Sequence, residues 1–285
     1  MRIIVAMAAT AAGLASTAFA QSPVERGRYL VESIVACGNC HTPQGPNGPI
    51  MNRALSGGPP IEEPNVFTAM PSNITPHPET GIGKWTDQQL KVAIREGKRP
   101  DGSIIGPPMP FEQYAKLADA DLDAIVAYLR TVPAIDNKVA ASTYKVPLPP
   151  AYGPPITQPV TAPPKTDKVA YGAYLAGPLG HCIECHTPMD QATHRFKYDT
   201  LLGAGGFQFH GPWGISVSRN ITSHPEDGIG KWTDAEIERA IRTGVGKEGR
   251  KLMPPMAYGY YAKINAEDMS ALIAYLRTIP AKKTQ

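Results

Sequence analysis

Apolar residues recur with helical spacing near the end of each half of the chain. In both runs they fall at i, i+3, i+4 and i+7, the spacing that places side chains on one face of a helix. The residues are Leu122, Ile125, Val126 and Leu129, then Met269, Leu272, Ile273 and Leu276. Each run stops shortly before a proline, Pro133 or Pro280. The pattern predicts two closing amphipathic helices.

Two more helices are predicted from their ends. Each would begin at a threonine with a Gln or Glu three residues later, which is a capping box, and end at a glycine. The residues are Thr86, Gln89 and Gly97, then Thr233, Glu236 and Gly244. We find no strand pattern that competes with these helices. The sequence therefore predicts an all-α fold.

The chain repeats itself once. Gly27-Arg28-Tyr29-Leu30 matches residues 172–175, and the seven residues 81–87 match 228–234 identically. The matching positions lie 145 residues apart at first and 147 residues apart later. A repeat of this length indicates a duplicated domain, because solenoid units run to roughly 20 to 50 residues.

A proline-rich segment separates the two copies. Residues 134–168 lack apolar periodicity and contain runs such as Val146-Pro147-Leu148-Pro149-Pro150. Such a composition favours an extended, semi-rigid linker of polyproline character, which can also pack across its neighbours. We therefore predict one domain at 21–133, a linker at 134–168 and a second domain at 169–285.

The first 20 residues read as a secretory signal. Arg2 gives the positive start, residues 3–14 the apolar stretch, and Ala18-Phe19-Ala20 the small-residue cleavage site before Gln21. Cleavage after Ala20 would send the protein to the periplasm. No later segment is apolar for long enough to span a bilayer. Any membrane attachment would then come through a partner.

Composition and charge narrow the class further. The chain of 285 residues is 42% hydrophobic and 19% charged, with 30 prolines and 27 glycines, which favours a globular protein with long irregular stretches. The formal net charge of +3 falls to +2 when Arg2 leaves with the signal. No basic run resembles a nucleic-acid footprint, and Lys282-Lys283 is interpreted as a solvated tail. We predict no nucleic-acid partner.

All four cysteines fall into two copies of Cys-x-x-Cys-His. These are Cys37-Gly38-Asn39-Cys40-His41 and Cys182-Ile183-Glu184-Cys185-His186. Two thiols at this spacing on a helical turn can form thioethers to the two haem vinyl groups, and the next residue then supplies the proximal imidazole. The sequence predicts two covalently bound haem c groups, with His41 and His186 as iron ligands.

Other interpretations of these cysteines exist. An exported chain with four cysteines invites a disulfide framework, but no cysteine lies outside the two motifs. A redox dithiol needs a preceding strand and no histidine, and a zinc site from both pairs needs the pairs to meet. Their equivalent places in the two copies argue against such a meeting.

Met109 and Met256 are the predicted second axial ligands. They match one another across the repeat, and each follows a Pro-Pro pair in a loop that can present a sulfur to iron. The rival residues are Met253 for the second haem and Met51 or Met70 for the first. The alternative to a ligand role is that both methionines only fill space in the hydrophobic core.

The remaining histidines are weaker candidates. His77 and His224 match across the repeat in polar turns and are expected to be exposed. His194 and His210 are interpreted as parts of a loop that the first copy lacks, which leaves a distal role open for them.

The motifs together resemble the bacterial mono- and dihaem cytochrome c family. They are Cys-x-x-Cys-His, Asn-Ile-Thr, Gly-Ile-Gly-Lys-Trp-Thr-Asp, Pro-Pro-Met and Ala-Tyr-Leu-Arg-Thr before Val-Pro or Ile-Pro. The domains are similar to those in cytochrome subunits of periplasmic alcohol, aldehyde and gluconate dehydrogenases. The resemblance implies two tandem class I cytochrome c domains. Those subunits commonly have three haem domains, whereas this chain has two motifs.

The resemblance implies electron transfer from a periplasmic dehydrogenase subunit to a cytochrome or terminal oxidase. The alternative is a dihaem redox enzyme. A peroxidase needs a haem with an openable distal site, and the thiosulfate dehydrogenases of this type use a cysteine as distal ligand, although no fifth cysteine exists here. A regulatory haem sensor would need an attached signalling segment, which the sequence does not suggest.

Overall fold

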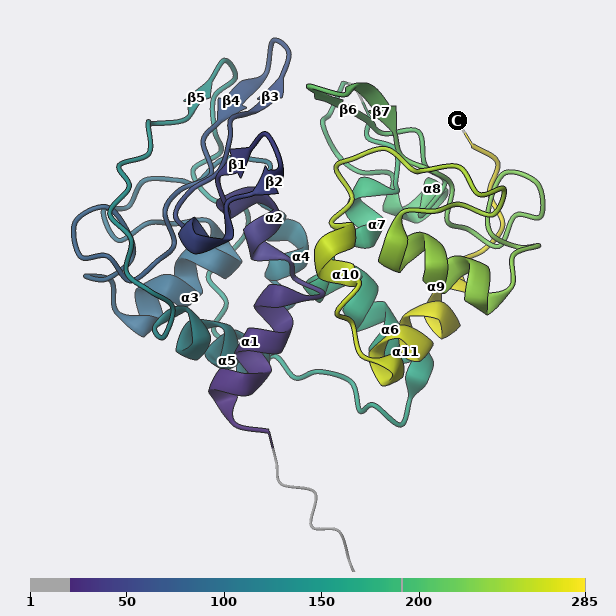
Figure 1. Cartoon of the computed structure of the whole chain (residues 1–285), viewed down its shortest axis with the longest axis horizontal. Coiled ribbons are helices and arrows are strands. Elements are labelled where there is room, and N and C mark those ends of the chain that lie inside the picture. The colour runs from purple at the N-terminus through teal and green to yellow at the C-terminus, as the bar shows by residue number, and fades with distance from the viewer. Residues whose placement is uncertain (1–20, 191, 285) are drawn as a thin grey trace, which may run out of the picture.

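The computed structural model describes residues 21–190 and 192–284. The predicted secretory signal, residues 1–20, lies outside the described residues. The chain forms two mainly helical halves side by side, joined by an extended segment that passes beneath them (Figure 1). The halves follow the two copies of the sequence repeat.

The first half has three helices of ten or eleven residues, α1, α3 and α5, with shorter elements between them. In chain order it contains α1 (Pro23–Glu32), α2 (Cys37–His41), β1 (Gln44–Gly45), β2 (Gly48–Pro49), the 3₁₀ turn η1 (Met51–Arg53), β3 (Ile61–Glu63), β4 (Phe67–Ala69), α3 (Asp87–Glu96), α4 (Phe111–Tyr114) and α5 (Asp119–Leu129). Strand β5 (Thr143–Tyr144) belongs to the following linker.

The second half repeats this order with one irregular turn. It contains α6 (Lys168–Tyr174), the π-helical turn η2 (Leu175–Leu179), α7 (Cys182–Cys185), α8 (Tyr198–Leu201), β6 (Gln208–Gly211), β7 (Gly214–Val217), α9 (Asp234–Thr243), α10 (Tyr258–Tyr261) and α11 (Ala266–Leu276). Helix α9 corresponds to α3, and α11 corresponds to α5.

Short strands correct the prediction that strands are absent. The pairs β1–β2 and β6–β7 form two-stranded sheets, and β3, β4 and β5 form a three-stranded sheet. All pairings are antiparallel and at most four residues long. Strands this short give no detectable alternation in the sequence. Helices are the main regular elements, and small hairpins lie on the loops between them.

The predicted helix ends are confirmed. Thr86 accepts a hydrogen bond from the Gln89 N–H, Thr233 does the same for Glu236, and both capping boxes are complete. Gly97 and Gly244 end these helices with a φ of 67°, in the left-handed region that favours glycine. The predicted closing helices correspond to α5 and α11.

Each half is closed by a tight helix crossing. Helix α1 packs on α5, and α6 packs on α11. Gly27 and Gly172 make the contact possible, since a Cβ on either would lie 1.8 Å from the Ala124 carbonyl oxygen or 2.0 Å from that of Ala271. The repeated Gly-x-Tyr-Leu motif therefore supplies a small residue where two backbones meet.

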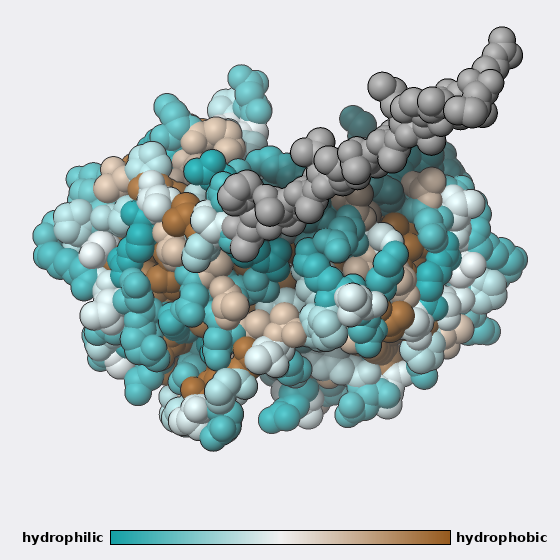
Figure 2. Space-filling model, turned by 90° about the horizontal axis from the view of Figure 1, so that it is seen from below, coloured by the Kyte–Doolittle hydropathy of each residue, from teal (hydrophilic) through white to brown (hydrophobic). Residues whose placement is uncertain are grey.

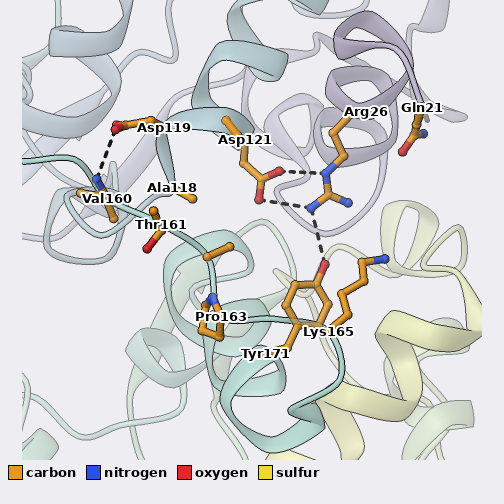
Figure 3. Close-up of a pocket in the computed structure, with 12 residues that line it drawn as sticks. Gln21, Arg26, Ala118, Asp119, Asp121, Val160, Thr161, Pro163, Lys165 and Tyr171 are labelled. Atoms are coloured by element: carbon orange, nitrogen blue, oxygen red, sulfur yellow. Dashed lines mark hydrogen bonds and ion pairs between the residues drawn. The ribbon is translucent and has the colours of Figure 1, made fainter.

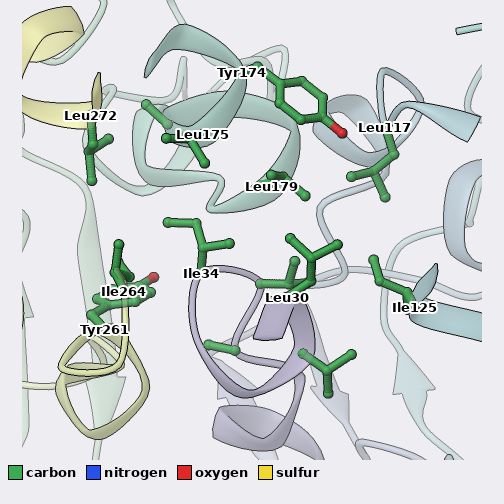
Figure 4. Packing of buried hydrophobic residues seen from close by; sticks show 14 of the residues in the cluster. Leu30, Ile34, Leu117, Ile125, Tyr174, Leu175, Leu179, Tyr261, Ile264 and Leu272 are labelled. Atoms are coloured by element: carbon green, nitrogen blue, oxygen red, sulfur yellow. The ribbon is translucent and has the colours of Figure 1, made fainter. Parts of the chain in front are cut away.

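The cores of the two halves are continuous. Leu30 and Ile34 of the first half lie close to Leu175 and Leu179 of the second, and all four are at most 1% exposed (Figure 4). Burial of this apolar surface is the main force that holds the halves together. The halves therefore form one body around a shared core.

The linker follows the surface of both halves. Strand β5 extends the β3–β4 sheet, and further on Val160 accepts a hydrogen bond from the Asp119 N–H and donates its own N–H to the Asp119 carboxylate. The face along which it runs is mainly hydrophilic, with small separate apolar patches (Figure 2). Among the described residues, no helix combines the length and apolarity that a membrane crossing requires.

Candidate functional site

The two Cys-x-x-Cys-His segments fold alike. Each forms a short helix, α2 or α7, that begins after a residue in the left-handed conformation, Ala36 at φ 51° or His181 at φ 41°. This residue separates the motif from the preceding element, and α2 contacts α1 as α7 contacts η2. All four cysteines are free thiols.

Both motif histidines are oriented by a backbone carbonyl. Nδ1 of His41 lies 2.7 Å from the Ser72 carbonyl oxygen, and Nδ1 of His186 lies 2.6 Å from that of Arg219. A carbonyl accepts only, so Nδ1 carries the proton and Nε2 keeps its lone pair. Burial lowers the pKa of both rings, which keeps them neutral. This arrangement suits a metal-ligating histidine and fits a haem iron at Nε2.

The thiols are not activated for dithiol redox chemistry. Burial raises the pKa of Cys37 to about 12 and the pKa of Cys40 and Cys182 to about 11, and it also raises the pKa of Cys185. Reactive dithiols of the thioredoxin type have lowered pKa values. Within residues 21–190 and 192–284, no three His, Cys, Asp or Glu side chains gather as a metal site.

The two Pro-Pro-Met loops also have the same form. Met109 and Met256 are partly buried and pack against the apolar core. Both loops contain a cis bond between their prolines. The rivals Met51 and Met253 are 59% and 47% exposed on the surface. The third rival, Met70, is partly buried like Met109, so burial sets aside Met51 and Met253 and leaves Met70 open beside Met109.

The first motif contacts the second half across the boundary between the halves. The Asn39 side chain of the first motif donates a hydrogen bond to the Pro255 carbonyl, next to Met256, over 3.2 Å. A Cβ on Gly38 would lie 2.2 Å from the Tyr260 hydroxyl, so this close approach needs a glycine. The first motif therefore touches the methionine loop of the second half.

A pair of crossed tyrosines also joins the halves, and sequence reasoning missed it. The Tyr29 hydroxyl donates to the Asp268 carboxylate over 2.7 Å and accepts from the Asn265 N–H over 3.3 Å. Tyr29 of α1 therefore caps the start of α11 in the other half. The acceptor carboxylate is fully buried.

The repeat-equivalent tyrosine does the same in reverse. The Tyr174 hydroxyl donates to the Asp121 carboxylate over 2.8 Å and accepts from the Ala118 N–H over 3.1 Å. Tyr174 of α6 thereby caps α5 of the first half. A sequence signal existed: the Tyr-Leu of the repeat, and an aspartate at the same early position of each closing helix.

The two buried aspartates pair with different cations. Arg26 of α1 binds Asp121 with Nε at 2.8 Å and Nη2 at 3.1 Å (Figure 3). Asp268 instead faces Lys165 of the linker, whose Nζ lies 3.5 Å away. The linker therefore supplies the cation beside the buried aspartate of the second half, whereas helix α1 supplies it in the first half.

Glu184 is an unusual member of the second motif. Burial and, to a smaller extent, the nearby charge of Glu112 together raise its pKa to about 8. Its Oε2 has no hydrogen-bond partner among the residues that the structure describes. The first motif has the neutral Asn39 at this position, so the two motifs differ in the charge that they can carry.

His77 and His224 are partly buried, which corrects the expectation that both are exposed, whereas His194 lies exposed on the surface. The Nδ1 atoms of His77 and His224 accept backbone N–H groups within their own turns and stabilise them. His210 corrects an expectation: it lies in the β6–β7 hairpin, which the β3–β4 hairpin mirrors in the first copy. Its Nδ1 lies 3.6 Å from a carboxylate oxygen of Glu63 on that hairpin.

Comparison with known proteins matches both halves of the chain to one family. The family model described as Cytochrome c matches residues 24–133 and 169–280. The chain is 33% identical to the fructose dehydrogenase cytochrome subunit of Gluconobacter japonicus, over 91% of this chain and 53% of that protein. It is 28% identical to the alcohol dehydrogenase (quinone) cytochrome c subunit of Gluconobacter oxydans (strain 621H), over 90% and 55%. It is 29% identical to a diheme cytochrome c-type protein of Cereibacter sphaeroides, over 86% and 82%.

The chain belongs to the cytochrome c family, in which haem c is bound covalently. It spans about half the length of the dehydrogenase cytochrome subunits that it matches. Electron transfer is the shared role of these relatives. The resemblance to the cytochrome c family drawn from the motifs is confirmed.

Proposed function

We propose that the chain carries two haem c groups and transfers electrons in the periplasm. One haem would be held by Cys37, Cys40 and His41, and its counterpart by the second motif at Cys182, Cys185 and His186. Met109 and Met256 would complete the iron coordination. The domains would span residues 21–133 and 169–285, joined by the linker at 134–168.

The observation that carries the proposal is the repeated histidine geometry. In both motifs a backbone carbonyl accepts the Nδ1 proton of the histidine, which leaves the Nε2 lone pair free to bind iron. The two cysteines of each motif are free thiols that can form thioethers. When bound, haem supplies a one-electron couple between ferric and ferrous iron. The protein orients the imidazole, excludes water with apolar residues and presents a thioether sulfur from a proline loop.

The relatives support a dehydrogenase as electron donor. Their names describe cytochrome subunits of fructose, alcohol and gluconate dehydrogenases. We propose that a dehydrogenase subunit reduces this chain and that a cytochrome or terminal oxidase receives the electrons. Cleavage after Ala20 would deliver the chain to the compartment in which such subunits operate.

Intact-mass and haemochrome measurements test the haem assignment. The protein isolated from a periplasmic fraction should carry two haems per chain and begin at Gln21. Replacing both Cys37 and Cys40 by Ala should leave one haem, and the matched change at Cys182 and Cys185 should leave the other. A wild-type chain with fewer than two haems would contradict the proposal. A haem that stays five-coordinate would favour the peroxidase alternative.

A further inference from the structure

The two Pro-Pro-Met loops share a backbone and differ in what covers them. In the first half the Ile105 N–H bonds to the Gly97 carbonyl over 2.7 Å, and Leu252 and Gly244 form the same bond over 2.7 Å in the second. The turns between them are also equivalent, since each contains one matching β-bridge. Differences between the loops therefore come from side chains and neighbours.

The linker covers the first loop. Its Tyr144 ring occupies the space beside Gly106, where a Cβ would come within 2.3 Å of the ring. Its Tyr152 stacks on Phe111 with ring centroids 4.7 Å apart and donates a hydrogen bond to the Ile105 carbonyl over 3.0 Å. Two tyrosines thus close the outer side of the loop that carries Met109.

The second loop is open at the same position. Met253 stands where the first loop has Gly106, and it is 47% exposed. Its backbone carbonyl accepts from the Tyr258 hydroxyl over 3.4 Å, which fixes the loop without covering the side chain. An apolar side chain therefore faces solvent three residues before the proposed ligand Met256.

The open loop is also basic. Its turn carries three exposed cationic residues at positions where the first loop has uncharged ones. Lys247, Arg250 and Lys251 replace Pro100, Ser103 and Ile104. Two carboxylates offset part of this charge, Glu248 at 3.4 Å from Arg250 and Glu236 at 3.9 Å from Lys247. Residues 245–253 keep an excess of two positive charges (three cations and one carboxylate), against one for the equivalent residues 98–106, which contain Lys98, Arg99 and Asp101.

We propose that residues 245–253 dock an acidic redox protein, and that the linker closes the equivalent face of the first half. This inference rests on the proposed function. An apolar centre with a charged rim is typical of transient protein interfaces, and complementary charge raises the rate of encounter. Electrons would then pass between that partner and the chain through the second half, close to Met256.

A protein partner fits this surface better than a lipid bilayer. Membrane-surface binding needs an amphipathic helix with several apolar residues on one face. Here the loop is a tight turn with one exposed apolar side chain, Met253. Binding to anionic vesicles is therefore an outcome that would count against the proposal.

Stopped-flow reduction by an acidic flavodoxin tests the docking face. The haem-loaded protein is compared with the double variant Arg250→Glu and Lys251→Glu. The control is Lys98→Glu with Lys116→Glu, which makes the same charge change on the first half. At low ionic strength the test variant should be reduced about tenfold more slowly, and the control less than about twofold. Added salt should abolish the difference.

Chemical-shift mapping with oxidised flavodoxin gives a readout independent of electron transfer. Perturbed amides should gather at residues 245–253. Perturbation at residues 97–106, equal slowing of the two double variants, or binding to anionic vesicles through Lys251 in place of flavodoxin would overturn the inference. A wild-type chain that dithionite cannot reduce would instead contradict the proposed function.

Replacement of the cover sharpens the test. Tyr144→Ser together with Tyr152→Ser should open the first loop, and its amides, residues 97–106, should then gain flavodoxin-induced shifts. Absence of such shifts in a folded variant would show that the linker does not decide which loop is accessible.

Discussion

The two halves share individual hydrogen bonds but differ in their dependence on the linker. In both, a carbonyl orients the motif histidine and a tyrosine from the other half caps the closing helix. In the first half, Asp121 is neutralised by Arg26 of α1. In the second half, Asp268 depends on Lys165 of the linker. The two copies therefore share the geometry of the candidate sites and of the junction, while the surroundings of these sites differ.

The largest expected effect comes from the glycines at the helix crossings. Gly27→Ala or Gly172→Ala would place a Cβ 1.8 or 2.0 Å from a carbonyl oxygen of the partner helix. We expect either variant to lose about 3 kcal/mol of unfolding free energy or more, because two backbones must separate. Denaturant unfolding followed by far-ultraviolet circular dichroism measures this loss.

Gly259→Ala is the matched control for these crossings. Its Cβ would meet nothing within 4 Å, and it lies inside α10. The helix propensity of alanine should leave stability unchanged or raise it by up to about 1 kcal/mol. Equal losses for all three variants would show that the crossings are not the constraint.

Removal of the arginine that neutralises Asp121 should have the next largest effect. Asp121 has an 8% exposed side chain. In Arg26→Met its carboxylate would keep the hydrogen bond from the Tyr174 hydroxyl but would lose its cation. Breaking a buried ion pair in this way costs about 3 kcal/mol. Thermal unfolding of Arg26→Met, compared with the double variant Arg26→Met with Asp121→Asn, measures this loss of unfolding free energy. Asp121→Asn removes the unpaired charge and should restore part of the lost stability.

The crossed tyrosines should differ in strength. Tyr29→Phe leaves Asp268 with the partly exposed Lys165, whereas Tyr174→Phe leaves Asp121 with Arg26 bound through two nitrogens. We expect Tyr29→Phe to lower the unfolding free energy by about 2 kcal/mol and Tyr174→Phe by about 1 kcal/mol, because Asp268 keeps fewer hydrogen-bond partners than Asp121 does. Chemical denaturation of the two single variants measures the order, and the reverse order would contradict the assignment of partners.

Removal of the linker lysine should have the smallest effect. The Lys165 side chain is 44% exposed, so water screens its attraction to Asp268. Lys165→Met should cost about 1 kcal/mol or less. A loss as large as that of Arg26→Met would mean that the linker holds the second half as firmly as α1 holds the first.

Much of this molecule follows from local sequence patterns. The capping boxes at Thr86 and Thr233, the closing helices and the repeat were all predictable, because each depends on residues close together in the chain. The short strands were not, since pairs of two to four residues depend on loop packing. The Tyr29–Asp268 and Tyr174–Asp121 bonds were also missed, because they join residues from different halves.

The candidate site divides in the same way. The spacing of Cys37, Cys40 and His41 identifies a haem motif without a structure, and the repeat singles out Met109. The carbonyl that orients His41 could not be predicted, because Ser72 lies 31 residues further along an irregular loop. The same holds for the linker tyrosines over the first methionine loop.

The most direct test of two equivalent haems, each with one histidine and one methionine ligand, is the absorption spectrum of the oxidised protein at its red edge. Ferric iron bound by a methionine sulfur gives a weak charge-transfer band there, and the axial ligand sets the potential. Met109→Ala and Met256→Ala should each remove about half of the band, and the exposed Met253→Ala should remove none. A band that keeps its full intensity after either of the first two changes, or that loses intensity with Met253→Ala, would contradict the account.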